Sequence, residues 1–221
     1  MADMLANVPK YIAESISHEA GHSLGLSHDG TSKSAYYYGQ GTQGSATGWA
    51  PIMGAGYYQN LVQWSKGEYL DANNKEDDLL IISSYLSYSP DDVPNTVSGA
   101  KRIPLGSTFS INGFIGKTGG VDIWSFQAGV GVLKISVNVS PASTSSNLDI
   151  RADLLSSTGA MILGAYPATV LSAAITYNAT VQGVYYLRLY GIGLGSPTAT
   201  GYTNYASLGQ YYATGTVVLP K

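Results

Sequence analysis

Three histidines and one glutamate in a single short stretch are the residues of this chain best suited to chemistry. The stretch reads Ser17-His18-Glu19-Ala20-Gly21-His22-Ser23-Leu24-Gly25-Leu26-Ser27-His28-Asp29. Residues four apart on a helix lie one above the other, so His18 and His22 would present two imidazoles to the same point, with Glu19 one step round the turn. That is half of a zinc site, because a catalytic zinc takes three protein ligands and keeps a fourth position for water.

The third ligand is expected from beyond the helix, since the next helical turn has the wrong geometry for a tetrahedron. Gly25 has no Cβ and can take a positive φ, so it can end the helix and turn the chain back until His28 approaches from another side. All three histidines of the chain fall in this stretch. The spacing therefore favours zinc binding over three unrelated surface or core histidines.

The chemistry that this arrangement predicts is hydrolysis of a peptide bond. Zinc lowers the pKa of its bound water towards about 7 and polarises a carbonyl oxygen. Glu19 would act as general base on that zinc-activated water and later pass the proton to the leaving amine.

The pattern His18-Glu19-x-x-His22-x-x-Gly25-x-x-His28 resembles the long zinc signature of the metzincin clan of metallopeptidases. An aspartate, Asp29, directly follows this signature, and in this respect the chain resembles the adamalysin-like branch and several bacterial secreted members of the clan. The resemblance implies a methionine-containing turn beneath the metal, and Pro51-Ile52-Met53-Gly54 lies at a suitable distance downstream. Without that context a single methionine would be core filling. Gly25, Asp29 and Met53 are therefore expected to support the zinc site.

Tyrosines downstream of the zinc stretch are candidates for contacts with substrate. Some metzincins carry a zinc-facing tyrosine two residues after the methionine, and here that position is Ala55. Tyr57 is the nearest tyrosine, and a transition-state or substrate contact is assigned to it by this resemblance alone. Residues 36–38, all tyrosine, would either line a substrate cleft or pack over the zinc helix.

The resemblance covers only the last part of a metzincin catalytic domain. A metzincin carries an upper subdomain before this helix, on the order of a hundred residues, whose edge strand pairs with extended substrate. Here seventeen residues precede His18. We therefore expect a fragment, a truncated chain or a degenerate relative, with activity weaker than that of a complete metzincin.

Composition limits the partners and the compartment. The net charge of −3, the pI near 5.5 and the lack of any Lys/Arg cluster argue against nucleic acid as a partner. No apolar run of about 18 residues exists that would span a membrane. With no cysteine, the zinc ligands must be nitrogen or oxygen. The low charge and the many Gly and Tyr residues favour a secreted β-rich protein, although residues 1–16 contain no signal peptide, so the export signal would lie outside this sequence.

The zinc helix is expected to begin near Pro9 with Asn7 as its N-cap, and to end at Gly25. Ile12, Ile16 and Ala20 would form its core-facing stripe.

The stretch after the zinc helix predicts one irregular loop and one further helix. Residues 30–48 are mostly Gly, Ser, Thr, Tyr and Gln, which is typical of irregular structure. Asn74 would cap the helix, in which Leu79, Ile82 and Leu86 recur at helical spacing. The acidic residues 76–78 would be a solvated first turn, or, as a second interpretation, ligands of calcium.

The pattern changes from helical to alternating beyond a linker at residues 90–97, which is rich in Pro and Asp. Strands are expected at 108–115, 121–126, 132–139, 148–155, 160–164, 171–177, 184–189 and 211–218. The predicted fold is therefore α+β: a short helical, metzincin-like zinc subdomain at residues 1–89, followed by an antiparallel β-sandwich at residues 98–221.

The second half resembles the bacterial pre-peptidase C-terminal domain, a β-sandwich that follows secreted proteases. The segments that carry this resemblance are residues 120–126, 147–150, 183–189 and 202–205. Polar residues within or beside them, Asp122, Asn147 and Asp149, would stabilise turns or bind calcium. The tyrosines between 202 and 212 would be exposed and attach to a polymer such as collagen or a polysaccharide, or would pack across strands.

Two functions remain as hypotheses. The first is a secreted zinc endopeptidase acting on protein or peptide substrates, with Zn²⁺ as cofactor and Ca²⁺ as a second candidate. The alternative is a non-catalytic binding or accessory module, in which the β-sandwich attaches to protein or polysaccharide and the truncated zinc subdomain is inactive. Hydrolysis of casein, with Glu19→Ala as control, separates the two.

Overall fold

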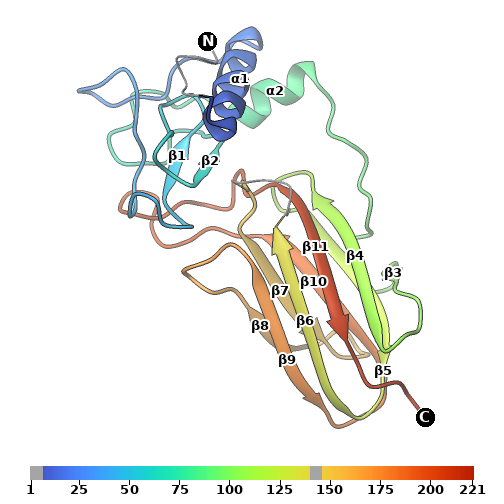
Figure 1. Cartoon of the computed structure of the whole chain (residues 1–221). Helices are drawn as coiled ribbons and strands as arrows, with labels where there is room; N and C mark the ends of the chain where they lie inside the picture. Colours follow the sequence, from blue (N-terminus) through green and yellow to red (C-terminus); the bar gives the residue numbers. More distant parts are fainter. Residues whose placement is uncertain (1–6, 140–145) are drawn as a thin grey trace. The chain divides into compact units, whose positions relative to one another are not determined.

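The computed structural model describes residues 7–139 and 146–221, which form two compact units (Figure 1). The first unit comprises the described residues within Met1–Tyr88, Ser143–Asn147 and Gly193–Ala206. The second comprises those within Ser89–Ala142, Leu148–Ile192 and Ser207–Lys221. A segment from late in the chain, Gly193–Ala206, thus belongs to the same unit as the zinc stretch.

Helix α1 (Pro9–Ser23) carries the first part of the zinc stretch, and Pro9 stands in its first turn as expected. The N-cap is Val8, which makes no side-chain hydrogen bond to the helix. The prediction of Asn7 as the cap is wrong, because Asn7 has φ 55° and an N-cap needs an extended backbone. At the other end Gly25 has φ 90° and reverses the chain, as predicted.

The apolar stripe expected on α1 is not its buried face. Ile16 is 62% exposed and Ala20 is also exposed, while Gly21 is the buried residue of the helix. The reason is packing. The side chains of Met53, Trp64 and Leu26 lie against α1 at Gly21, so the Gly21 face of the helix is the one that is buried. The prediction was wrong for Ile16 and Ala20.

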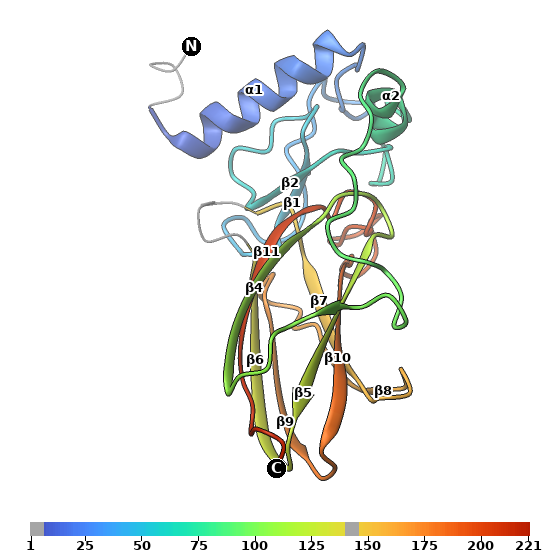
Figure 2. The ribbon, with the colours of Figure 1, turned by 90° about the vertical axis from the view of Figure 1, so that its right-hand side faces the viewer.

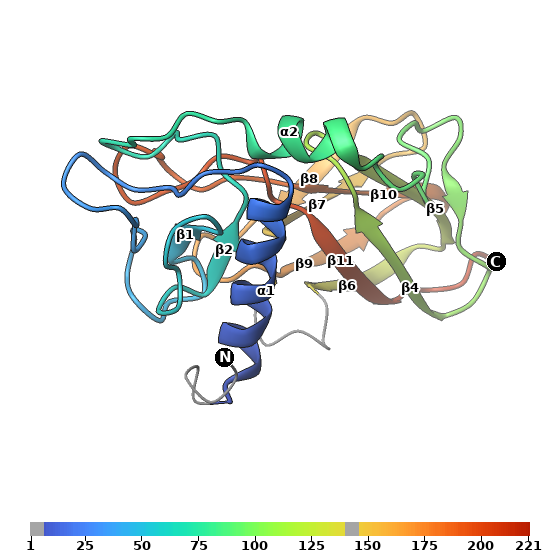
Figure 3. The same cartoon turned by 90° about the horizontal axis from the view of Figure 1, so that it is seen from above.

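Two short parallel strands and a second helix complete the regular structure of the first unit. Strands β1 (Trp49–Pro51) and β2 (Leu61–Gln63) are fully buried and pair with Trp49 opposite Leu61. Figure 3 shows them beside α1. Residues 30–48 contain only isolated bridges, which confirms the irregular loop.

The N-cap of helix α2 (Asp78–Tyr85) lies three residues later than predicted. Its N-cap is Asp77, whose carboxylate accepts the Leu80 N–H at 3.0 Å. Asn74 is not the cap, because its side-chain oxygen accepts the Glu76 N–H within the preceding turn. Asp78 is 1% exposed, so the acidic first turn is not fully solvated as expected.

The second unit is a β-sandwich of two sheets, which appear as two layers in Figure 2. One sheet has the strand order β3-β5-β10-β7-β8 and the other β4-β11-β6-β9. The strands are β3 (Lys101–Arg102), β4 (Thr108–Ile115), β5 (Val121–Ala128), β6 (Gly131–Val139), β7 (Ile150–Leu155), β8 (Met161–Ala165), β9 (Ala173–Ala179), β10 (Gly183–Gly191) and β11 (Gly209–Thr216). All eight strands expected from alternation are present, and β3, which runs parallel to β5, was not expected.

The core of the second unit is drawn from alternate residues of both sheets, including Trp124, Leu154, Leu187, Ile135 and Ala213. Such alternation leaves every second side chain on an outer face. Three tyrosines of the segment expected to be exposed are buried instead: Tyr202, Tyr205 and Tyr211 are 2%, 8% and 2% exposed. Of the two interpretations of this segment, exposed attachment is wrong for these three tyrosines, because they fill the interiors of the two units, and packing within the fold is the one that remains.

Candidate metal centre

The imidazoles of His18, His22 and His28 converge on one point. One ring nitrogen from each lies within 4.8 Å of the other two, and Nε2 of His22 is 2.9 Å from Nε2 of His28. Nitrogen ligands of a tetrahedral zinc are about 3.3 Å apart, given bonds of about 2.0 to 2.1 Å. The three rings therefore suit a single zinc ion, and they come from α1 and from the turn that Gly25 begins.

The orientation of two rings is fixed by backbone carbonyls. Nδ1 of His18 lies 2.8 Å from the Ile52 oxygen, and Nδ1 of His22 lies 2.8 Å from the Leu26 oxygen. A carbonyl only accepts, so each Nδ1 carries the proton and each Nε2 presents a lone pair. This is the tautomer that a metal ligand requires, and the backbone selects it.

His28 is held in its neutral form. Partial burial lowers its pKa, and the neighbouring His22 and His18 lower it further, while the charge of Glu19 acts in the opposite direction. A neutral imidazole is the form that binds a metal ion. This effect places the Glu19 carboxylate near His28, and the Glu19 side chain is exposed on α1.

The Pro51–Gly54 turn packs directly against the zinc helix. Met53 is 0% exposed. Its sulfur lies only 2.5 Å from the position that a Cβ on Gly21 would occupy. The same turn supplies the Ile52 oxygen that orients His18. Met53 thus lies against α1 at Gly21, the residue before His22; that it supports a metal site stays a prediction.

Asp29 ties the His28 turn to this methionine turn. Its N–H donates to the Met53 oxygen at 2.8 Å, and its own oxygen accepts the Tyr37 N–H at 2.8 Å. The carboxylate is buried, with Oδ2 lacking a hydrogen-bond partner among the described residues. Burial, reinforced by the charge of Glu76, raises the pKa of Asp29 to about 7. The role of Asp29 seen here is structural.

A second anchor, not anticipated from the sequence, holds the residue before His28. Both carboxylate oxygens of Glu76 accept from Ser27, one from the N–H at 2.8 Å and one from the hydroxyl at 2.9 Å. Partial burial would raise the pKa of Glu76, but these bonds and one from Asn74 bring it below its ordinary value. Glu76 therefore fixes the chain between Gly25 and His28.

The tyrosine beside the histidines is Tyr36. Its ring centroid is 4.4 Å from that of His28 and 6.2 Å from that of His18, and the side chain is 37% exposed. Tyr57, predicted to contact substrate, packs against Tyr11 near the start of α1, with ring centroids 5.3 Å apart. Of the three tyrosines at 36–38, only Tyr36 has its ring against the histidines. The local sequence did not distinguish Tyr36 from the other two.

The residues considered for calcium are placed in three different surroundings. The carboxylates of Asp91, Asp92 and Asp122 lie within 4.8 Å of one another, and Asp122 accepts the Tyr211 hydroxyl. Asp149 exchanges backbone hydrogen bonds with the Ser207 hydroxyl, which is the turn-stabilising interpretation. The Asn147 oxygen accepts from the Gln63 side chain at 2.6 Å.

No helix in the described part of the chain is long and apolar enough to cross a membrane.

One comparison with known proteins matches the part of the chain that carries this centre. Residues 8–85 match the family model of Peptidase M66. None of the curated proteins compared with the chain matches it. Among solved structures, one similar chain is the pre-peptidase C-terminal domain of a collagenase from Bacillus anthracis (19% identity, 57% of this chain and 97% of that chain covered, TM-score 0.38). Another is PliG, a periplasmic inhibitor of g-type lysozyme from Aeromonas hydrophila (8% identity, 52% and 93% covered, TM-score 0.35). The three converging histidines and Glu19 all lie in the segment that matches a peptidase family.

Proposed function

We propose that the first unit is a zinc-dependent endopeptidase of metzincin type that acts outside the cell. The observation that carries this proposal is the convergence of three imidazole nitrogens within 4.8 Å, two of them held in the ligand tautomer by backbone carbonyls. The match of residues 8–85 to Peptidase M66 supports hydrolysis of peptide bonds as the reaction.

His18, His22 and His28 would hold the metal. When bound, zinc would lower the pKa of a water molecule in its open position and polarise the peptide carbonyl. Glu19 would accept a proton from that water on a carboxylate oxygen and transfer it to the leaving nitrogen of the peptide. Its side chain is exposed on α1.

The decisive experiment combines metal binding with hydrolysis of a quenched peptide. The chain is expected to bind one zinc ion and to hydrolyse the peptide only with zinc present. Glu19→Gln should keep the zinc and lose at least about 100-fold in rate, as expected for a general base. Glu14→Gln is the matched control, since Glu14 lies on the same helix and is paired with Lys10.

His22→Ala should remove both zinc binding and hydrolysis. Hydrolysis that continues in 1,10-phenanthroline, or in Glu19→Gln at the original rate, would refute the proposal. Zinc binding without hydrolysis by the original chain would instead favour the alternative, an accessory module with an inactive zinc subdomain.

A further inference from the structure

Two arginines share one buried aspartate on the outer face of the five-stranded sheet. Asp153 is 0% exposed; its Oδ1 accepts Arg151 Nε at 2.8 Å, and its Oδ2 accepts Nε and Nη2 of Arg188 at 3.0 and 2.6 Å. The Tyr190 hydroxyl donates to the same Oδ2 at 3.1 Å. Every oxygen of the carboxylate is therefore engaged, and both guanidinium groups are held in place.

Register between neighbouring strands builds this cluster. Arg188 on β10 stands opposite Asp153 on β7, and Tyr190 stands opposite Arg151. On the other side Asp153 faces Gly164 of β8. A Cβ on Gly164 would lie 2.6 Å from Asp153 Oδ1 and 3.0 Å from Arg151 Nη2. Because glycine has no side chain, Gly164 leaves room for the ion pairs.

The cluster keeps an uncompensated positive charge at the surface. Two guanidinium groups face one carboxylate, and each guanidinium has five N–H donors. Neither Nη1 atom has a hydrogen-bond partner in the part of the chain that the structure describes, and the side chains of Arg151 and Arg188 remain 23% and 33% exposed. Fixed, planar donors of this kind suit the oxygens of a carboxylate or sulfate.

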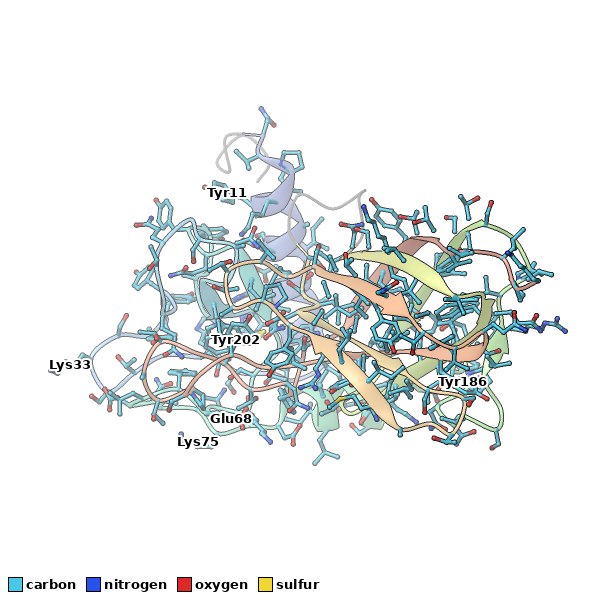
Figure 4. The ribbon with its side chains drawn as sticks, turned by 90° about the horizontal axis from the view of Figure 1, so that it is seen from below. Tyr11, Lys33, Glu68, Lys75, Tyr186 and Tyr202 are labelled. Atoms are coloured by element: carbon cyan, nitrogen blue, oxygen red, sulfur yellow. The ribbon has the colours of Figure 1, made fainter. Side chains whose placement is uncertain are left out.

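Aromatic rings flank the two arginines. Tyr166 is 57% exposed, and its ring centroid is 4.4 Å from Cζ of Arg151. The Tyr190 ring is 5.6 Å from Cζ of each arginine. Tyr186 lies two residues before Arg188 on the same face of β10 by strand alternation, and it is labelled in Figure 4. Rings with an apolar face and a polar hydroxyl suit a ligand that is itself ring-shaped, apolar on one face and hydroxylated at its rim.

We propose that this arginine–tyrosine cluster binds an acidic polysaccharide through a carboxylate or sulfate ester on one of its sugar rings. The excess charge selects the anion, and the tyrosines favour a sugar over an extended acidic peptide. An ion pair that only joined β7 to β10 would need Arg188 alone. Arg151 donates from Nε to Asp153 and from Nη2 to Met161 Sδ at 3.8 Å, which leaves its Nη1 and the exposed ring of Tyr166 to face a ligand. This site is separate from the metal centre and does not depend on it.

The test measures binding of the whole chain to four polymers: polygalacturonate, dextran sulfate, neutral dextran and poly-glutamate. We expect binding to the polygalacturonate or to the dextran sulfate, weakening as salt is raised, and none to neutral dextran. The stronger of the two acidic polysaccharides identifies the anion. Binding to poly-glutamate as tight as to both acidic polysaccharides would overturn the choice of a sugar, and binding to neither polysaccharide would overturn the site.

Variants separate the site from general charge. Arg151→Gln, which leaves Asp153 with Arg188 and Tyr190, should weaken binding at least tenfold. Arg102→Gln, an exposed arginine on β3 of the same sheet, should leave binding unchanged. Tyr166→Ala removes an exposed ring without touching any hydrogen bond of Asp153, so it tests the site even if Arg151→Gln fails to fold. Equal binding by Tyr166→Ala and the original chain, with their melting temperatures also equal, would overturn the proposal.

Discussion

The sulfur of Met53 lies 2.5 Å from where a Cβ on Gly21 would lie, so a side chain at position 21 would force Met53 to shift away from helix α1. Trp64 and Leu26 close the same space at 3.2 and 3.3 Å. Glycine normally weakens a helix, by about 1 kcal/mol relative to alanine. Here close packing of the turn outweighs that loss.

Gly21→Ala is therefore expected to lower the free energy of unfolding by about 1 kcal/mol net, since overpacking costs about 1–3 kcal/mol and helix propensity returns about 1 kcal/mol. Ser23→Ala, an exposed change in the same helix, should stay within about 0.5 kcal/mol. Urea denaturation monitored by circular dichroism measures both. A Gly21→Ala protein more stable than the original would contradict the close packing.

Glu76→Ala should lower zinc affinity about tenfold while leaving the stoichiometry at one ion, because it frees the chain next to His28 rather than removing a ligand. Asp71→Asn is the matched control. Asp71 also accepts both the N–H and the hydroxyl of a serine, Ser32, but in a loop farther along the chain. Zinc competition with a fluorescent chelator measures the affinities, and an equal effect of the two variants would show that Glu76 has no special role.

Tyr36→Ala should lower kcat/KM about tenfold and leave zinc binding unchanged, since its ring packs on His28 at the centre but supplies no metal ligand. Tyr38→Ala, 61% exposed in the same loop, should behave like the original chain. Hydrolysis of the quenched peptide by zinc-loaded protein provides the rates. Loss of zinc from Tyr36→Ala would show that the ring supports the ligands instead of contacting the substrate.

Stability of the metal-free chain should decrease between pH 5 and pH 8, in part because of Asp78. Burial raises the pKa of Asp78 from 3.8 to about 8, so the folded state binds more protons than the unfolded state across this range. The free energy of unfolding then falls as pH rises. In Asp78→Asn the decrease should be smaller by more than about 1 kcal/mol, which one pKa unit already represents. Parallel pH profiles of the two proteins in urea would contradict this.

Tyr205→Phe should destabilise the first unit by about 1–3 kcal/mol, the cost of leaving buried polar groups unpaired. The Tyr205 hydroxyl accepts the Leu79 N–H at 2.7 Å and donates to Asp77, the N-cap of α2. Tyr85→Phe, whose ring is 67% exposed, is the control. Thermal unfolding compares them, and equal melting temperatures would indicate that the late segment adds nothing to α2.

Local pattern was sufficient to predict much of this molecule. The strands from β4 to β11 follow from alternation because each has one face in the core, and the meeting of His18 with His22 follows from helical spacing alone. Gly25 was identifiable because few other residues adopt a positive φ. In each of these cases the cause lies within a few residues of the effect.

The remaining features depend on contacts distant in sequence. Nothing near Ile16 indicates that its face of α1 is exposed, since the outcome depends on Met53 and Trp64. Likewise, Asp77 and Asn74 are both good N-cap residues. Asp77 is the one that caps α2, and it also binds Tyr205, which is distant in sequence. Glu76 was missed as part of the centre, and Tyr36 was not distinguished from Tyr37 and Tyr38. The reason is the same: their partners, Ser27 and His28, are brought to them only by the folded chain.

The Gly193–Ala206 segment also sets an order of events during synthesis. Its residues leave the ribosome after nearly all the strands of the sandwich, yet Thr203 binds Glu68 at 2.6 Å inside the first unit. A nascent chain that already contains every histidine therefore still lacks part of the unit to which they belong. The unit that carries the histidines can therefore complete its fold only after residues 193–206 have been synthesised, long after the histidines themselves.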